Sequence, residues 1–118
     1  YRNGLREEPW LTIPDCPDTL RHAYYKLPVL LDQNLDTQQF RRILGEEFLV
    51  ENGTIYDPPC HLQPVYQDYF GLEKGSFPKS ESALARQLCP PVHSTLPNEE
   101  VDRVIHAMKS VAERLISN

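Results

Sequence analysis

Apolar and polar residues follow two different periods along this chain, and together they predict a mixture of strands and helices. From 22 to 31 the apolar residues fall at every second position, which is typical of a strand with one buried face. A shorter strand is predicted at 9–14, between two prolines, and another at 54–56. A last short strand is expected at 88–89, because the two prolines that follow would stop it.

Apolar residues three and four positions apart predict the helices. The first helix is expected to begin at Asp36, because Asp36 and Gln39 have the spacing of a capping box. It is expected to end at 52–53, where an Asn-Gly pair permits the left-handed conformation. Two short helices are predicted at 64–70 and 80–88.

The last helix has the clearest periodic pattern, with apolar residues recurring between 101 and 115. We expect Asn98 to cap its N-terminus, or Pro97 to be its first residue. Ser80 is the expected N-cap of the preceding short helix.

These elements occur in a mixed order, and the helices are too unevenly placed for a repeated strand–helix–strand series. The expected fold class is therefore α+β, with a small antiparallel sheet and helices packed on one face of it. A length of 118 residues fits one domain of ordinary size, so residues 1–118 are interpreted as a single domain.

Composition and charge argue against several classes of function. The hydrophobic share of 40% and the charged share of 25% are usual for a folded globular protein. A net charge of -5 argues against a nucleic-acid partner, which needs clustered Lys and Arg. No apolar stretch approaches the ~20 residues that span a bilayer, so no membrane partner is expected. Cysteines that are odd in number and irregularly spaced favour free thiols and a cytoplasmic location.

Three prolines stiffen the segment 56–66, Tyr-Asp-Pro-Pro-Cys-His-Leu-Gln-Pro-Val-Tyr, and remove backbone donors from it. The segment holds His61 and Gln63 between aromatic residues, so we interpret it as a loop that presents side chains to a pocket. A neutral imidazole offers one donor and one acceptor, which suits a hydroxyl group. Two other interpretations stay open: His61 braces its own loop, and Tyr56 is a packing residue.

Cysteine and histidine occur near one another at 60–61 and again at Cys89 and His93. Zinc sites pair their ligands at short, regular spacing, which these residues lack, so no metal site is expected. Cys89 is interpreted instead as a small buried hydrophobic residue. Arg86 is interpreted as a structural arginine, with a substrate phosphate as its alternative partner.

Five segments follow one another in a recognisable order. They are 22–29, 56–64, 75–81, 88–93 and 99–105; the first begins His-Ala-Tyr-Tyr, the second contains His-Leu-Gln-Pro, and the third has a Gly and a Pro ahead of Glu81. In this order and spacing they resemble the C-terminal small domain of the DegT/DnrJ/StrS family of pyridoxal-phosphate-dependent aminotransferases. The resemblance covers about residues 10–108.

The resemblance implies that this chain is one part of a larger enzyme, usually a homodimer, with an N-terminal large domain that is absent here. The implied substrate is a nucleotide-linked keto sugar or a related cyclitol, and the implied amino donor is glutamate or glutamine. Pyridoxal phosphate would be bound through a lysine of the large domain. The chain alone is therefore expected to bind no cofactor and to be inactive, because none of its lysines lies in a matching context: Lys26, Lys74, Lys79 and Lys109.

Within the chain, the resemblance implies a substrate-binding role for His61, Tyr56 and Gln63, with His61 facing the active-site cleft, and no catalytic residue. The alternative is a free-standing interaction module that holds a partner with its exposed aromatic residues: Tyr66, Tyr69, Phe70 and Phe77. Because the chain begins at Tyr1 and its single methionine is Met108, we expect it to belong to a longer protein.

Overall fold

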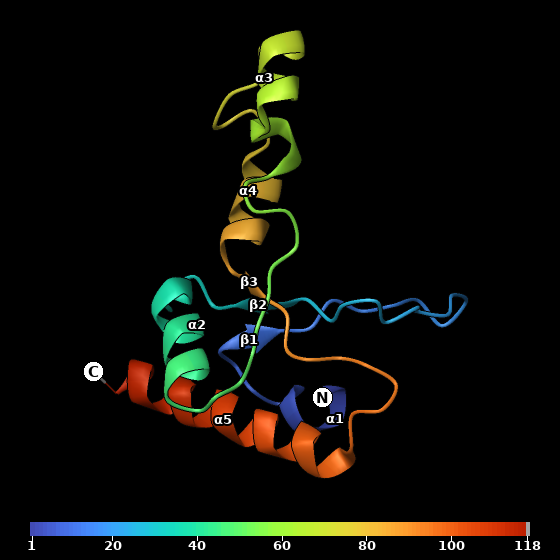
Figure 1. Ribbon diagram of the computed structural model, residues 1–118, viewed down its shortest axis with the longest axis vertical. Helices are drawn as coiled ribbons and strands as arrows, with labels where there is room; N and C mark the ends of the chain where they lie inside the picture. The colour runs from blue at the N-terminus through green and yellow to red at the C-terminus, as the bar shows by residue number, and fades with distance from the viewer. Residues whose placement is uncertain (118) are drawn as a thin grey trace.

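A three-stranded antiparallel sheet connects the elements of this fold (Figure 1). The computed structural model describes residues 1–117. The elements in chain order are α1 (Arg2–Leu5), β1 (Leu11–Thr12), β2 (Val29–Leu31), α2 (Thr37–Glu46), the 3-10 helix η1 (Cys60–Leu62), α3 (Pro64–Phe70), α4 (Pro78–Ala85), β3 (Gln87–Leu88) and α5 (Asn98–Ile116). The strand order is β1-β2-β3. The predicted fold class, α+β with helices packed on one face of a small antiparallel sheet, is confirmed.

The molecule has two parts of different character (Figure 1). The body consists of the sheet with α1, α2 and α5, and α5 packs against both other helices. The arm, which we define as residues 56–86, contains η1, α3 and α4 and projects away from the body. The two parts meet at the sheet, because β3 follows the arm directly.

The hydrophobic core lies in the body. Its members are buried and come from every element of the body: Leu5, Trp10, Leu11, Leu27, Val29, Leu31, Leu35, Phe40, Ile43, Leu44, Val50, Leu88, Val104, Ala107, Met108, Val111 and Ala112. Trp10 packs on Phe40 with ring centroids 5.8 Å apart, and its indole N–H donates to Glu8 at 2.8 Å. Hydrogen bonds from Lys109 and Trp10 hold the pKa of Glu8 below its usual value. The contact of Glu8 with Lys109 joins the segment after α1 to α5.

The strand predicted at 22–31 forms only in its last part, as β2. Residues Val29 and Leu30 pair with β3, and Leu30 and Leu31 pair with β1, so both sides of this strand are occupied. Pro28 has no N–H to continue the ladder. Before it the chain leaves the sheet, with Tyr24 in the left-handed region at φ 50 and Tyr25 87% exposed. The period-two pattern was therefore correct for the core-facing residues and wrong for the exposed end.

Helix α2 begins as predicted and ends earlier. The Asp36 carboxylate accepts a hydrogen bond from the Gln39 N–H at 2.9 Å, which is the predicted cap. The predicted stop at 52–53 is wrong, because the chain already turns at Leu49, which has φ 53. Asn52 instead donates from its side chain to the carbonyls of Arg41 and Val50, at 3.1 and 3.2 Å.

The strand predicted at 54–56 does not form, and a side chain takes the place of its partner. Ile55 donates its N–H to the side-chain oxygen of Gln87 at 3.1 Å, and the Gln87 amide donates back to the Ile55 carbonyl. Gln87 is 3% exposed, so its buried polar group is satisfied by backbone, as buried amides need. Two residues further along each segment, Gly53 and Cys89 form an isolated bridge.

The remaining helices differ from prediction mainly at their starts. Helix α3 has the predicted bounds, Pro64–Phe70. Helix α4 begins at Pro78 and ends at Ala85, so the expected N-cap Ser80 lies inside it and the following residues form β3. Neither capping prediction for α5 is correct, because Pro97 occupies the N-cap position in an extended conformation and Asn98 is the first helical residue.

Phe40→Ala is expected to destabilise the 118-residue chain by about 3–5 kcal/mol, because it leaves a cavity against Trp10 in the core. Phe70→Ala is a matched control, since Phe70 is 69% exposed, and should change the free energy of unfolding by less than about 0.5 kcal/mol. Urea unfolding followed by circular dichroism measures both. Equal losses in the two variants would show that the core has been placed wrongly.

Candidate functional site

His61 is the one buried side chain of the arm, all of which the structure describes. It lies in η1, and its Nε2 is 3.0 Å from Oε1 of Glu81 in α4. The ring of Phe77 meets the imidazole edge-on, with centroids 5.0 Å apart and an interplanar angle of 67°. The His61 and Glu81 side chains are 9% and 16% exposed, so water competes little for this contact.

Glu81 is held in place by backbone amides. Its two carboxylate oxygens accept from the Gly75 N–H at 2.9 and 3.0 Å, and Oε1 also accepts from the Phe77 N–H at 3.1 Å. Phe77 is the N-cap of α4 and has no side-chain cap of its own, so Glu81 supplies one by reaching back. Gly75 has φ 96, a conformation that favours glycine and turns its N–H toward the carboxylate.

Loss of solvent around Glu81 by itself would raise the pKa of this carboxyl. The hydrogen bonds from Phe77 and Gly75, followed by the contact with His61, outweigh that effect and hold the pKa below its usual value. Glu81 is therefore ionised at neutral pH and acts as an acceptor only.

The other two predicted site residues lie apart from His61. Gln63 donates from its side chain to the Pro58 carbonyl at 3.0 Å, which braces the loop around the cis Asp57–Pro58 peptide. Tyr56 is 67% exposed and lines a cavity of about 280 Å³ at the base of the arm. The structure therefore does not bring the three predicted side chains to one cavity.

The cavity at the base of the arm lies between α2 and α4. Arg41 of α2 and Lys74 of the arm contribute positive charge to its lining, and Asp57 and Glu81 contribute negative charge. Glu81 thus links the cavity to His61, and sequence reasoning missed this role. Its position in the first turn of a helix that begins with Phe-Pro was the available signal, since such residues reach back to free N–H groups.

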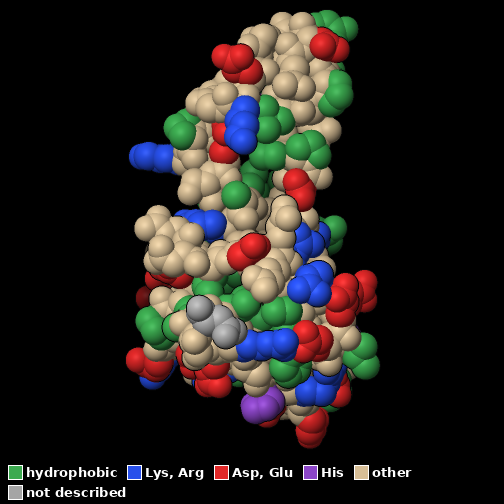
Figure 2. Space-filling model, turned by 90° about the vertical axis from the view of Figure 1, so that its left-hand side faces the viewer, with side chains coloured by type: hydrophobic (Ala, Val, Ile, Leu, Met, Phe, Trp, Pro, Cys, Tyr) green, Lys and Arg blue, Asp and Glu red, His purple; other side chains and the backbone are tan. Residues whose placement is uncertain are grey.

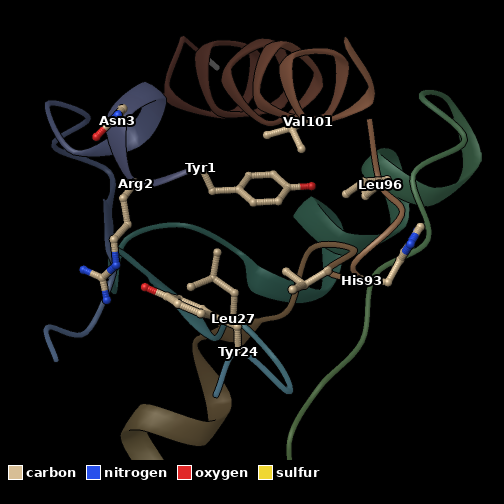
Figure 3. Close-up of a pocket in the computed structure, with 9 residues that line it drawn as sticks. Tyr1, Arg2, Asn3, Tyr24, Leu27, His93, Leu96 and Val101 are labelled. Carbon is tan, nitrogen blue, oxygen red and sulfur yellow. The ribbon is translucent and has the colours of Figure 1, made fainter. Parts of the chain in front are cut away.

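A second cavity, of about 380 Å³, lies in the body beneath α5 (Figure 3). The ring of Tyr1 crosses it, with Leu27 below and Val101 above. Its hydroxyl is buried without a hydrogen-bond partner among the described residues, and burial raises the pKa of Tyr1 to about 12. His93 at the edge contacts Thr95 at 3.0 Å instead of a group inside the cavity. This cavity lacks the converging polar groups of a binding site.

Several other candidates have structural roles. Arg86 donates to the Leu31 and Ser82 carbonyls, at 3.0 and 3.4 Å, so it is a structural arginine. Cys89 is buried, as predicted, and burial raises the pKa of its thiol. Within residues 1–117 no group of three or more His, Cys, Asp or Glu side chains could hold a metal ion. No helix in the same residues combines the length and apolar character needed to cross a membrane.

Comparison with known structures places this fold among aminotransferases. The aminotransferase TlmJ from Streptoalloteichus hindustanus matches it with a TM-score of 0.82 at 27% sequence identity, over 98% of this chain and 30% of that one. The fold of the present chain, a helix-covered sheet with a projecting arm, is thus an aminotransferase fold.

Two curated relatives agree with this class. The erythromycin biosynthesis sensory transduction protein EryC1 of Saccharopolyspora erythraea is 34% identical over 113 residues, which cover 95% of this chain and 29% of the relative. The spore coat polysaccharide biosynthesis protein SpsC of Bacillus subtilis is 24% identical over 116 residues, covering 96% and 30%. The DegT/DnrJ/EryC1/StrS aminotransferase family model matches residues 1–109, so the chain belongs to that family. It spans less than a third of the length of these relatives.

Aminotransferases of this family generally use pyridoxal phosphate. The surroundings of the lysine side chains within residues 1–117 do not suit its attachment. Lys26 donates to the Thr54 carbonyl at 2.8 Å, and Lys109 pairs with Glu8 at 2.6 Å. Lys74 and Lys79 are exposed on the arm. None of these amines lies in a closed pocket with an anion cradle in residues 1–117, as attachment of a phosphorylated aldehyde requires.

Glu81→Gln is expected to destabilise the arm at neutral pH and to do so less in acid. Because the folded-state pKa of Glu81 lies below 4.5, its ionised form stabilises the fold above pH 4.5, and this contribution is lost as the pH falls through the folded-state value. Hydrogen exchange of the Gly75 and Phe77 amides, compared between variant and wild type at each pH, measures the effect. Glu73→Gln, an exposed change on the same arm, is the control. An equal change in amide exchange for Glu81→Gln at neutral and at acid pH would contradict this account of the carboxylate.

Proposed function

We propose that this chain is the small domain of a pyridoxal-phosphate-dependent aminotransferase that acts on a nucleotide-linked keto sugar or a related cyclitol. Residues 1–118 form that one domain, and the amino donor is glutamate or glutamine. An N-terminal large domain of the same protein holds the cofactor on a lysine, and the whole enzyme is a homodimer in the cytoplasm. Family membership supports the reaction, and the kinship with a polysaccharide biosynthesis protein supports a sugar substrate.

The observation that carries this proposal is the arm, which exposes apolar side chains and buries almost none. Helix α3 has no buried residue. Large hydrophobic side chains on the arm are 43% to 81% exposed: Tyr56, Val65, Tyr66, Tyr69, Phe70 and Phe77. In the space-filling view, hydrophobic side chains lie on the surface of the arm together with a few charged ones, and charged side chains are more numerous over the body (Figure 2). An exposed apolar surface of this kind is typical of a site that another protein surface covers.

The large domain is the partner that we propose for the arm. The matched relatives are more than three times as long as the segment that this chain covers, so they contain other protein that could cover an arm of this kind. In this arrangement the arm would close one side of the active site and exclude water from it. Tyr56 and His61 would contact the substrate, and Gln63 would hold the loop that carries them.

A free-standing interaction module is the alternative that the same exposed surface supports. It would use Tyr66, Tyr69, Phe70 and Phe77 to hold another protein and would need no cofactor. The free thiols of Cys16 and Cys60 are compatible with a reducing compartment in either case.

The complete gene product is expected to be coloured by bound pyridoxal phosphate. Reduction with borohydride should fix a pyridoxyl label on a lysine outside residues 1–118, and the 118-residue chain alone should remain colourless and inactive. Absorption spectroscopy and peptide mapping measure both results. A colourless full-length protein that takes up no cofactor would overturn the enzyme proposal and favour the interaction module.

The isolated 118-residue chain is expected to self-associate at high concentration, because its arm lacks the partner that we propose. Tyr69→Ser should weaken this association, whereas Tyr25→Ser, an equally exposed change outside the arm, should not. Sedimentation velocity over a concentration series measures it. A clean monomer at every concentration, or equal effects of the two variants, would count against the arm as a docking surface.

A further inference from the structure

Glu81 and His61 come together from segments that are 20 positions apart, and three backbone or side-chain donors converge on one carboxylate. Two of these donors, the N–H groups of Gly75 and Phe77, belong to the turn that leads into α4. The backbone therefore holds the carboxylate independently of its contact with His61. Its third donor is the imidazole, and no other charged side chain of residues 1–117 forms a hydrogen bond with that ring.

This contact determines which imidazole nitrogen carries the proton. An ionised carboxylate only accepts hydrogen bonds, so Nε2 of His61 must be the donor across the 3.0 Å separation. In the neutral ring the proton then lies on Nε2, and Nδ1 keeps a lone pair. Rotating the ring by half a turn would put a carbon atom in place of Nε2 and leave the carboxylate without this donor.

Nδ1 has no hydrogen-bond partner among the described residues and is not fully buried. No hydrogen bond to this atom occurs among residues 1–117. In those residues the Tyr1 hydroxyl is the one polar side-chain atom that is both fully buried and unpartnered, so Nδ1 is not fully buried. The edge-on contact with Phe77 restricts the ring, so the lone pair of Nδ1 points in one direction.

We propose that Glu81 is a positioning residue: it holds His61 as the Nε2–H tautomer, so that Nδ1 accepts a hydrogen bond from a hydroxyl group of the substrate. This inference rests on the proposed function, and it adds the kind of substrate group that the site binds, a hydroxyl donor. A sugar ring offers hydroxyl donors to such an acceptor. A keto, ether or phosphate oxygen at the same place offers no proton, so it would face the lone pair of Nδ1 unfavourably.

The arrangement also explains why a histidine is suited to this position. Gln at position 61 could donate to Glu81, but it would offer nothing at the place of Nδ1. His61→Gln therefore separates the structural contact from the proposed binding contact. Glu81→Gln has the complementary effect, because a neutral amide can either accept from the ring or donate to it, and it no longer selects one tautomer.

Nitrogen NMR of the full-length protein, labelled at histidine, tests the tautomer directly and needs no substrate. The His61 signals are assigned by their loss in His61→Gln. The spectra are recorded at a pH at which the His61 ring is neutral. There the wild-type proton is expected on Nε2 with Nδ1 unprotonated, and Glu81→Gln should give a mixture of tautomers. In the neutral ring, a proton on Nδ1, or an unchanged tautomer in Glu81→Gln, would each overturn the inference.

Steady-state kinetics of the full-length enzyme, with the nucleotide-linked keto sugar that it aminates, tests the binding role. Glu81→Gln and His61→Gln are each expected to lower kcat/KM about 10-fold, the effect of one lost hydrogen bond in a site shielded from water. Glu73→Gln is the matched control and should leave kcat/KM unchanged. Unchanged values in both site variants would overturn the role of Nδ1. If the full-length protein shows no aminotransferase activity, the proposed function fails, and the NMR result still decides whether Glu81 positions His61.

Discussion

The pairing of β2 on both of its edges is the constraint on which the rest of this structure depends. The strand is only three residues long, yet it joins β1, from the N-terminal segment, to β3, from the far side of the arm. Val29 and Leu31 are fully buried, so the same residues that bring the strands together also form the floor of the core. Without this pairing β3 would not be attached to the sheet, and the C-terminal end of the arm would not be anchored to the body.

The body and the arm are held by different forces. In the body, burial of apolar side chains around Phe40 stabilises the fold without requiring precise directions. The arm has no such core, and its segments are joined by directed hydrogen bonds to Glu81, Gln63 and the backbone near them. Directed bonds fix orientation more sharply than apolar contacts do, which suits a segment that must present a side chain at a set angle.

Sequence patterns predicted those parts of the structure that depend on interactions between residues a few positions apart. The Asp36 cap, the bounds of α3 and the periodic face of α5 each depend on residues a few positions apart. The pairing of Ile55 with the side chain of Gln87 could not be predicted in this way, because it joins residues 32 positions apart and replaces a backbone partner. The contact between His61 and Glu81 was missed for the same reason. His61 was chosen from its stiff loop, whereas Glu81 gains its role only once α4 returns beside that loop.

The distribution of polar and apolar side chains in the arm separates what this chain can do alone from what requires a covering protein. Its polar contact is inside and its large apolar side chains are outside, the reverse of an independent domain. Glu81 can orient His61 within the chain itself, since all the donors that hold the carboxylate belong to residues 61–77. A dry and enclosed surrounding for Nδ1, however, requires a surface that covers the aromatic residues of the arm. Orientation of the imidazole is thus a property of this chain, whereas the strength of the hydrogen bond that Nδ1 accepts depends on the protein that closes over it.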